Sequence, residues 1–405
     1  MVFRFPKFGG IPSRSTIVPN LKPVISQNLL SASLGCPGDG TWDQRRYMSL
    51  NLRFSESDWE RIGRDWSAWW AGDLSRPLVV LECIQPEDLR HPHHAGTFLG
   101  NYPLDTPPDE ILDIFTPRLE ATHYLGDAFP RFWPNFGPGI VAAFAGALVH
   151  PAADTTWFSP GKTGSVTDLS VSCDWQNAWW RRVCEFTQAA VERWGKQLAV
   201  GFTDLGGNLD ILAHLRGAQQ LLLDLYDAPE EIDRLVRETT QAWLECHAKL
   251  SDLIAPAGRG ITCWGPCWSS GSGYMLQSDV SYMISPKMFA HFALPDLAAC
   301  CEKMDYAFYH LDGKGQIPHL DMLLSLPRLR GIQWVPGDGN PPPEHWLPLL
   351  KCIRDSGKLC QVTVSPHGAL TILRALGGQG FAFVISEPQL TPEEGAEFLK
   401  QFFSA

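Results

Sequence analysis

The second half of the chain repeats one pattern, in which a short apolar run ends abruptly in polar side chains and glycine. In the clearest case, Tyr306-Ala-Phe-Tyr-His-Leu-Asp-Gly313, an aromatic run closes on His310 and Asp312. The same change recurs at the ends of at least four other runs, 198–203, 260–263, 331–335 and 359–364, which lead into Asp204, Trp264, Asp338 and His367. Such runs are typical of strands buried in a parallel sheet, and barrel enzymes place their chemistry at the carboxyl ends of these strands.

Helical stretches separate these apolar runs. Ser55 or Ser57 can cap a helix rich in tryptophan, and a second helix is expected over 109–125. A capping residue followed by an early proline predicts three further helix starts, at Asp227-Ala-Pro-Glu230, Ser285-Pro286 and Thr391-Pro-Glu-Glu394. The runs 76–83 and 381–385 predict the first and last strands, whereas 130–139 is too rich in Pro and Gly for a regular element.

Alternating strands and helices predict an α/β fold, either a TIM (β/α)8 barrel or an open, doubly wound sheet. The sequence contains neither the glycine fingerprint of a dinucleotide site nor the lysine motif of a phosphate loop, which favours the barrel. Residues 1–47 differ from the rest, because they are rich in Gly, Pro, Ser and Arg and lack an apolar period. We therefore expect 1–47 to be a disordered extension and 48–405 to be a single barrel domain, with Met48 as a candidate natural start.

Composition narrows the classes of partner. The chain carries 33 basic and 44 acidic residues, a formal net charge of -11, which disfavours nucleic acid and anionic membranes as partners. The longest apolar run, 140–149, is too short to cross a bilayer, and the N-terminus lacks the apolar segment of a secretory signal. Eleven cysteines at scattered spacings argue against a disulfide framework and favour a reducing cytoplasm.

His310 and Asp312 are the strongest candidates for chemistry. They lie two residues apart, so in a continuing strand they share one face. This arrangement suits metal ligation or a histidine–carboxylate acid/base pair, with a hydrogen-bond network at the sheet rim as the structural alternative. His367, at another strand end, is a further candidate ligand.

A second polar group follows the run 198–203. Asp204, Asn208 and Asp210 could bind a cationic or pyrrole-nitrogen substrate or hold a proton, or they could cap the following helix. Other candidates for substrate binding lie at strand ends or in the connections between elements: Trp264, Gln277, Asp279, Gln333, Trp334 and Asp338. Gln333 and Trp334 point in opposite directions in an extended strand, so only one of them faces the sheet interior.

Several of these segments, taken in order, resemble the uroporphyrinogen decarboxylase superfamily. The resemblance covers about half of the chain, from Gly201 to the C-terminus, and extends more loosely back to Arg76. It rests on Gly201-Phe-Thr-Asp-Leu-Gly-Gly-Asn208, Leu222-Leu-Asp-Leu-Tyr-Asp-Ala-Pro-Glu230, Gln277-Ser-Asp279, Ile284-Ser-Pro286, Phe292-Ala-Leu-Pro295 and Tyr309-His-Leu-Asp-Gly313. The resemblance implies a TIM barrel and one of two activities, decarboxylation of a porphyrinogen or methyl transfer to or from corrinoids and thiols.

The methyltransferase branch implies a zinc held by a His-x-Cys pair and a second cysteine from a later strand. Here the pair is His310-x-Asp312, and the later strand carries Cys360 and His367. A carboxylate thus replaces a thiolate, which suits zinc or a harder divalent ion. The arginine-rich motif by which the true decarboxylases grip their substrate has no match near Arg76 or Arg90.

The leading hypothesis is a cytoplasmic methyltransferase that uses a divalent metal held by His310, Asp312 and His367. It would exchange a methyl group between a small substrate and a thiol or a corrinoid carried by a partner protein. The alternatives are a metal-free decarboxylase for a porphyrinogen or other carboxylated aromatic, in which Asp204 stabilises charge, and a non-catalytic binder of a tetrapyrrole or metabolite.

Overall fold

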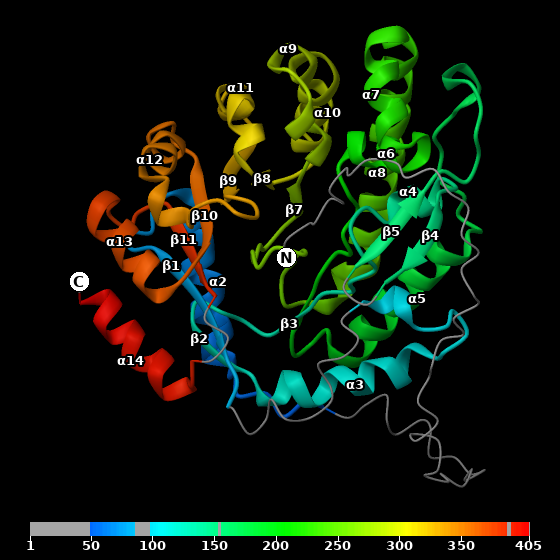
Figure 1. Cartoon of the computed structure of the whole chain (residues 1–405). Coiled ribbons are helices and arrows are strands. Elements are labelled where there is room, and N and C mark those ends of the chain that lie inside the picture. Colours follow the sequence, from blue (N-terminus) through cyan, green and yellow to red (C-terminus); the bar gives the residue numbers. More distant parts are fainter. Residues whose placement is uncertain (1–48, 86–97, 153–154, 387–389, 405) are drawn as a thin grey trace, which may run out of the picture. The chain divides into compact units, whose positions relative to one another are not determined.

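A seven-stranded sheet is the largest sheet in the computed structural model, which describes residues 49–85, 98–152, 155–386 and 390–404 (Figure 1). The order of its strands is β2-β1-β11-β10-β9-β8-β7. All neighbours are parallel except β2, which runs antiparallel to β1. The strands are β1 (Leu78–Cys83), β2 (His123–Gly126), β7 (Gly273–Leu276), β8 (Tyr306–Asp312), β9 (Leu329–Val335), β10 (Leu359–Val364) and β11 (Phe381–Ile385). The predicted α/β class is confirmed.

Two smaller sheets accompany the large one. β3 (Arg131–Phe132) pairs in parallel with β6 (Ala199–Val200), and β4 (Leu148–Pro151) forms an antiparallel pair with β5 (Thr156–Ser159). A single parallel bridge joins Gly201 to Thr262. Within the described ranges no ladder connects the β3–β6 pair to either edge of the large sheet, so closure into a barrel stays a prediction.

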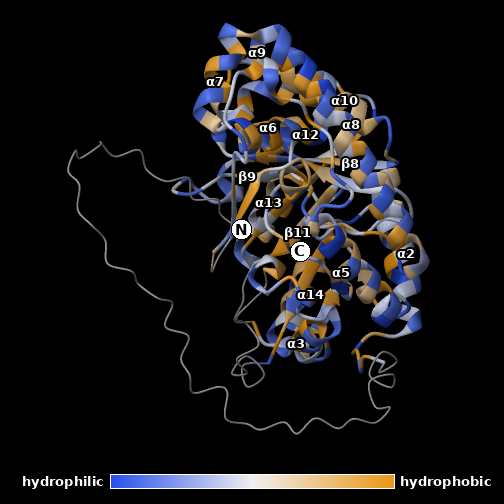
Figure 2. Ribbon diagram, turned by 90° about the vertical axis from the view of Figure 1, so that its right-hand side faces the viewer, coloured by the Kyte–Doolittle hydropathy of each residue, from blue (hydrophilic) through white to orange (hydrophobic). Residues whose placement is uncertain are grey.

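Helices follow most of the strands and flank the sheet: α2 (Glu56–Ala71), α3 (Pro108–Ala121), α4 (Val141–Phe144), α5 (Ala178–Trp194), α6 (Asn208–Arg216), α7 (Ala218–Asp227), α8 (Pro229–Ile254), α9 (Pro286–Met288), α10 (Leu294–Cys301), α11 (Leu320–Leu324), α12 (Leu347–Asp355), α13 (Pro366–Leu376) and α14 (Pro392–Phe403). Hydrophilic and hydrophobic residues alternate along them, as in amphipathic helices that bury one face (Figure 2). No helix in the described part is long and apolar enough to cross a membrane.

Helix α2 covers the amino ends of the sheet strands with tryptophan. Its predicted cap is confirmed, because the Ser55 side chain accepts a hydrogen bond from the backbone N–H of Asp58. Trp69 donates its indole N–H to the carbonyl of Phe381, the first residue of β11, over 3.1 Å. The ring of Trp70 packs on Tyr306, the first residue of β8, with centroids 5.0 Å apart. Packing at this end leaves the carboxyl ends of the strands for the site.

Three local predictions need correction. The helix expected over 109–125 ends at Ala121, because the next residues pair with β1 as strand β2. Asp227 does not cap α8; it is the last residue of α7, and Pro229 as the first helical residue makes Ala228 the N-cap. The Pro- and Gly-rich tract 130–139 contains the short strand β3. In the first and third cases, pairing with a distant strand outweighs the local signal.

Candidate metal centre

Strand β8 carries His310 and Asp312 to its carboxyl end on one face of the sheet. His310 is 7% exposed, and its Nε2 atom lies 3.9 Å from Oδ2 of the partly exposed Asp312. Gly313 follows with a φ of 79°, a left-handed conformation that suits glycine and ends the strand. The strand therefore presents one imidazole and one carboxylate at its end, as the sequence predicted.

Asp279 brings a second carboxylate to this pair. It lies three residues after the end of β7, the neighbour of β8 in the sheet. One ligand atom from each of Asp279, His310 and Asp312 lies within 4.8 Å of the other two. The Oδ1 atom of Asp279 is enclosed and has no hydrogen-bond partner. An enclosed carboxylate oxygen without a donor is costly, and a cation would satisfy it.

Asp210, in the first turn of α6, holds the backbone of Asp279. Its two carboxylate oxygens accept hydrogen bonds from the N–H groups of Asp279, at 2.9 Å, and Val280, at 2.8 Å. At the start of α6, Gly207 lies so close to the loop that a Cβ there would be 2.2 Å from the carbonyl oxygen of Gln277. Asp210 was a candidate for substrate binding, but its oxygens face the backbone that positions Asp279.

Asp210→Asn is expected to destabilise the protein by about 1–3 kcal/mol. The amide has one oxygen, so its NH2 group would face a backbone N–H and leave that buried donor unsatisfied. Urea unfolding of the two proteins measures the difference. Asp224→Asn is the comparison, because Asp224 is also a buried aspartate. Its carboxylate, on α7, forms an ion pair with Arg216 on α6. Only Asp210→Asn should also weaken divalent-metal binding, and equal metal affinity in both variants would contradict the role given to Asp210.

Burial and crowding of carboxylates control protonation at this site. Burial raises the pKa of Asp279 well above its ordinary value, and the nearby carboxylates of Asp210, Asp312 and Asp204 raise it further. Burial lowers the pKa of His310, against the opposing effects of Asp312 and Gln333. A neutral imidazole is the form that binds metal, and a bound cation would offset the repulsion between the carboxylates.

Asp204 is a separate buried carboxyl group close to this cluster. It is 5% exposed, and one of its oxygens accepts a hydrogen bond from the N–H of Gly206 at 2.9 Å. Burial raises its pKa to about 7, assisted by the charge of Asp210. A carboxyl group with a pKa near neutrality can both give and accept a proton under physiological conditions.

The aromatic ring of Trp264 and the amide of Gln333 complete the surroundings of His310. Trp264 meets the imidazole edge-on, with ring centroids 4.9 Å apart and planes at 88°. Gln333, on β9, places Oε1 2.5 Å from Nδ1 of His310. Trp264 and Gln333 were both expected to bind substrate. In the structure they instead contact His310, a candidate metal ligand.

The remaining candidates are not part of the cluster of Asp279, His310 and Asp312. Asn208 donates to Asp296 and to Thr240 on α8, and Trp334 packs on Trp346 at the start of α12, with centroids 5.1 Å apart. Both therefore face neighbouring helices. Asp338 is exposed in the loop after β9, and His367 is exposed in the first turn of α13. Gln277 is buried, with its carbonyl against Gly207.

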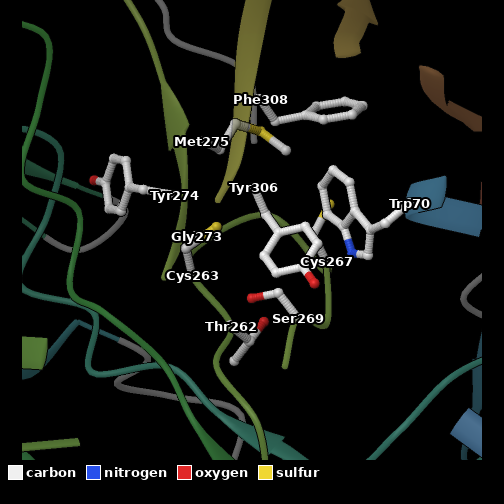
Figure 3. Close-up of a pocket in the computed structure, with 10 residues that line it drawn as sticks. All are labelled: Trp70, Thr262, Cys263, Cys267, Ser269, Gly273, Tyr274, Met275, Tyr306 and Phe308. Atoms are coloured by element: carbon white, nitrogen blue, oxygen red, sulfur yellow. The ribbon is translucent and has the colours of Figure 1, made fainter. Parts of the chain in front are cut away.

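A small cavity lies near the other end of the strands (Figure 3). Its lining includes Gly273 and Tyr306, the first residues of β7 and β8. Trp70 and the thiol of Cys267 also line it, whereas none of Asp279, His310 and Asp312 does. The residues that line it include no histidine and no carboxylate, so this cavity is separate from the candidate metal centre.

Sequence reasoning missed two contributions to this site. Asp279 was expected to bind substrate, yet it lies with His310 and Asp312, because β7 and β8 are neighbours. Gln361 was not a candidate, although it is fully buried and contacts Gln333. One signal was present in the sequence, since an amide in the middle of the apolar run 359–364 needs a polar partner.

Comparison with known proteins gives a fold but no family. No protein-family model matches the sequence, and no curated protein matches it. Among solved structures, the chain is similar to a methyltransferase from Methanosarcina mazei, with a TM-score of 0.57 and 12% sequence identity. The match covers 85% of this chain and 99% of that one. At this identity the similarity shows a common α/β fold.

Proposed function

We propose that the protein is a methyltransferase that moves a methyl group between a small substrate and a thiol or a corrinoid carried by a partner protein. A divalent metal bound by Asp279, His310 and Asp312 would assist the transfer. The observation that carries the proposal is the set of three donor groups within 4.8 Å of one another, one of which has an enclosed oxygen without a partner. The methyltransferase activity of the structural neighbour from Methanosarcina mazei supports the class of reaction.

The arrangement of strands supports a TIM barrel as the finer description of the fold. A barrel of eight parallel strands would use β1, β3, β6, β7, β8, β9, β10 and β11 in this order. Parallel pairing joins six of the eight neighbouring pairs that it needs: β3–β6, β7–β8, β8–β9, β9–β10, β10–β11 and β11–β1. In such a barrel, Asp279, His310 and Asp312 would lie at the carboxyl face, where barrel enzymes place their catalytic groups.

The donor set suits zinc or a harder divalent ion. One imidazole nitrogen and two carboxylate oxygens are common zinc ligands, and fewer soft thiolates favour harder ions. When bound, the metal would supply Lewis-acid activation of a thiol or of the oxygen or nitrogen that carries the methyl group. The chain's own part is to hold the donor groups: β8 fixes His310 and Asp312, and Asp210 fixes Asp279.

Asp204 would move the proton. In transfer from a methylated corrinoid to a thiol, a sulfur–carbon bond forms and the cobalt–carbon bond breaks, leaving both of its electrons on cobalt. The thiol loses its proton, and the Asp204 carboxylate, whose pKa is about 7, can accept it near neutral pH. Trp264 beside His310 would shield the reacting group from water.

The test uses free methylcobalamin and 2-mercaptoethanol as probes. The full-length protein with Zn²⁺ is expected to convert methylcobalamin to cob(I)alamin, which is followed by its absorbance under anaerobic conditions. The same protein after chelation should lose the activity, and added Zn²⁺ should restore it. Equal rates with and without protein would contradict methyl transfer to thiols, and equal rates before and after chelation would contradict the role of the metal.

Decarboxylation is the second candidate, and Asp204 is the observation that favours it. A buried carboxyl group with a pKa of about 7 could donate a proton to the carbon that loses CO2. This reaction needs no metal. Release of CO2 from a porphyrinogen by the chelated protein would favour decarboxylation over methyl transfer.

A further inference from the structure

Three neighbouring strands carry a row of buried polar side chains that begins at His310. His310 on β8 is paired in register with Gln333 on β9, and Gln333 is paired with Gln361 on β10. Residues in register on parallel strands point to the same face, so the three side chains can touch. Gln333 Nε2 lies 2.7 Å from Gln361 Oε1, and Gln361 Nε2 lies 3.2 Å from the Cys267 sulfur and 3.4 Å from the Pro266 carbonyl oxygen.

The contact between Gln361 and the Pro266 carbonyl determines which group donates in every hydrogen bond of the row. The Pro266 carbonyl can only accept, so the amide group of Gln361 that faces it is NH2 and not oxygen. Oε1 of Gln361 then accepts from the NH2 group of Gln333, and Oε1 of Gln333 faces His310. The atom opposite that oxygen, Nδ1 of His310, must donate, which leaves its Nε2 without a proton when the ring is neutral.

We propose that Gln333 and Gln361 are positioning residues that hold His310 as the Nδ1–H tautomer and leave Nε2 free for a divalent cation. Nε2 is the atom on the side of Asp312, at 3.9 Å from Oδ2. The metal in this statement rests on the proposed function, whereas the tautomer is a property of the protein without metal. Partners that orient a metal-binding histidine in this way typically contribute 10–100-fold to metal affinity.

The amide side chains of Gln333 and Gln361 are neutral, so they add no charge to the site. A carboxylate is a frequent partner for a metal-binding histidine, and it would add a negative charge beside Asp279 and Asp312. Gln333 is 5% exposed and Gln361 is fully buried, so an added charge would be costly at either position. The neutral row therefore orients His310 without increasing the repulsion between the two aspartates.

The test reads the tautomer directly in the metal-free protein. The full-length chain is labelled with ¹⁵N-histidine, and NMR at pH 8 distinguishes a protonated from an unprotonated ring nitrogen. The His310 signals are assigned by their loss in His310→Gln. We expect a protonated Nδ1 and an unprotonated Nε2 in the wild type. An Nε2–H tautomer would overturn the proposal.

Two substitutions of Gln361 separate positioning from packing. Gln361→Met removes the acceptor for Gln333 and should convert His310 to a mixture of tautomers. Gln361→Glu should preserve Nδ1–H, because a carboxyl group kept neutral by burial can donate its O–H to the Pro266 carbonyl and accept from Gln333 with its other oxygen. Cys360→Ala is the control, because it removes a neighbouring buried side chain of β10 outside the row. It should leave the tautomer unchanged. An unchanged tautomer in a folded Gln361→Met protein would also overturn the proposal.

The second measurement is the affinity for Zn²⁺ alone, determined by chelator competition. It should fall about 10–100-fold in Gln361→Met and stay within about twofold in Cys360→Ala. If the wild type has the expected tautomer and Gln361→Met shifts it, but neither protein binds Zn²⁺, the positioning of His310 is supported and the proposed function is contradicted.

Discussion

His310→Ala is expected to abolish stoichiometric binding of a divalent metal while leaving the fold intact. The imidazole supplies the only nitrogen among the three donors, and its loss should lower the affinity by at least about 100-fold, since outer partners alone are worth 10–100-fold. His310 lies at a strand end, so its removal disturbs little of the apolar core. Elemental analysis and the melting temperature of the full-length protein measure the two effects.

His367→Ala is the matched control. His367 is exposed on α13 and stands apart from the three donors, so its loss should change neither metal content nor melting temperature. Asp312→Cys tests the same site in the opposite direction, because a softer thiolate should raise the affinity for zinc. Metal loss in His367→Ala with full metal content in His310→Ala would refute the ligand set.

Asp204→Asn is expected to stabilise the protein at pH 8 and to lower its activity. Folding raises the pKa of this carboxyl group from 3.8 to about 7, so the folded chain binds the proton more tightly than the unfolded chain. The stability of the wild type therefore falls as the pH rises from about 4 to 7, by on the order of 4 kcal/mol. Asparagine does not ionise, so its advantage should be about 2–4 kcal/mol at pH 8 and should vanish near pH 4.

Asp296→Asn separates this electrostatic effect from catalysis. Burial also raises the pKa of Asp296 to about 7, and its carboxylate accepts from Asn208 and Thr240. Both variants should gain stability at pH 8 in urea unfolding, but only Asp204→Asn should slow methyl transfer. Equal activity of the two variants would remove Asp204 from the reaction.

The sequence predicted the strands that have long apolar runs. It also predicted that His310 and Asp312 lie at the carboxyl end of one of these strands. β8, β9, β10 and β11 lie where the pattern placed them, because a parallel strand that is buried on both faces is mostly apolar along its length. β7 was missed, since Gly273–Leu276 is short and follows a stretch of Ser and Gly. Short strands are fixed by pairing with their neighbours, here β8, which one stretch of sequence does not reveal.

The site was predictable in part for the same reason. His310 and Asp312 share one strand, so their spacing alone places them on one face. Asp279 joins them through the pairing of β7 with β8 and the hydrogen bonds from Asp210, both of which depend on residues distant in sequence. His367 was expected at the end of a strand, as His310 was. The chain instead begins helix α13 at Pro366, and His367 is exposed there.

A crystal structure of the full-length protein soaked with Zn²⁺, with anomalous data collected at the zinc edge, tests the central claim most directly. We expect one strong peak bound by Nε2 of His310, at about 2.0–2.1 Å, and by carboxylate oxygens of Asp279 and Asp312, at about 2.0–2.2 Å. A crystal with no peak at these three side chains, or with zinc held elsewhere in the protein, would contradict the account.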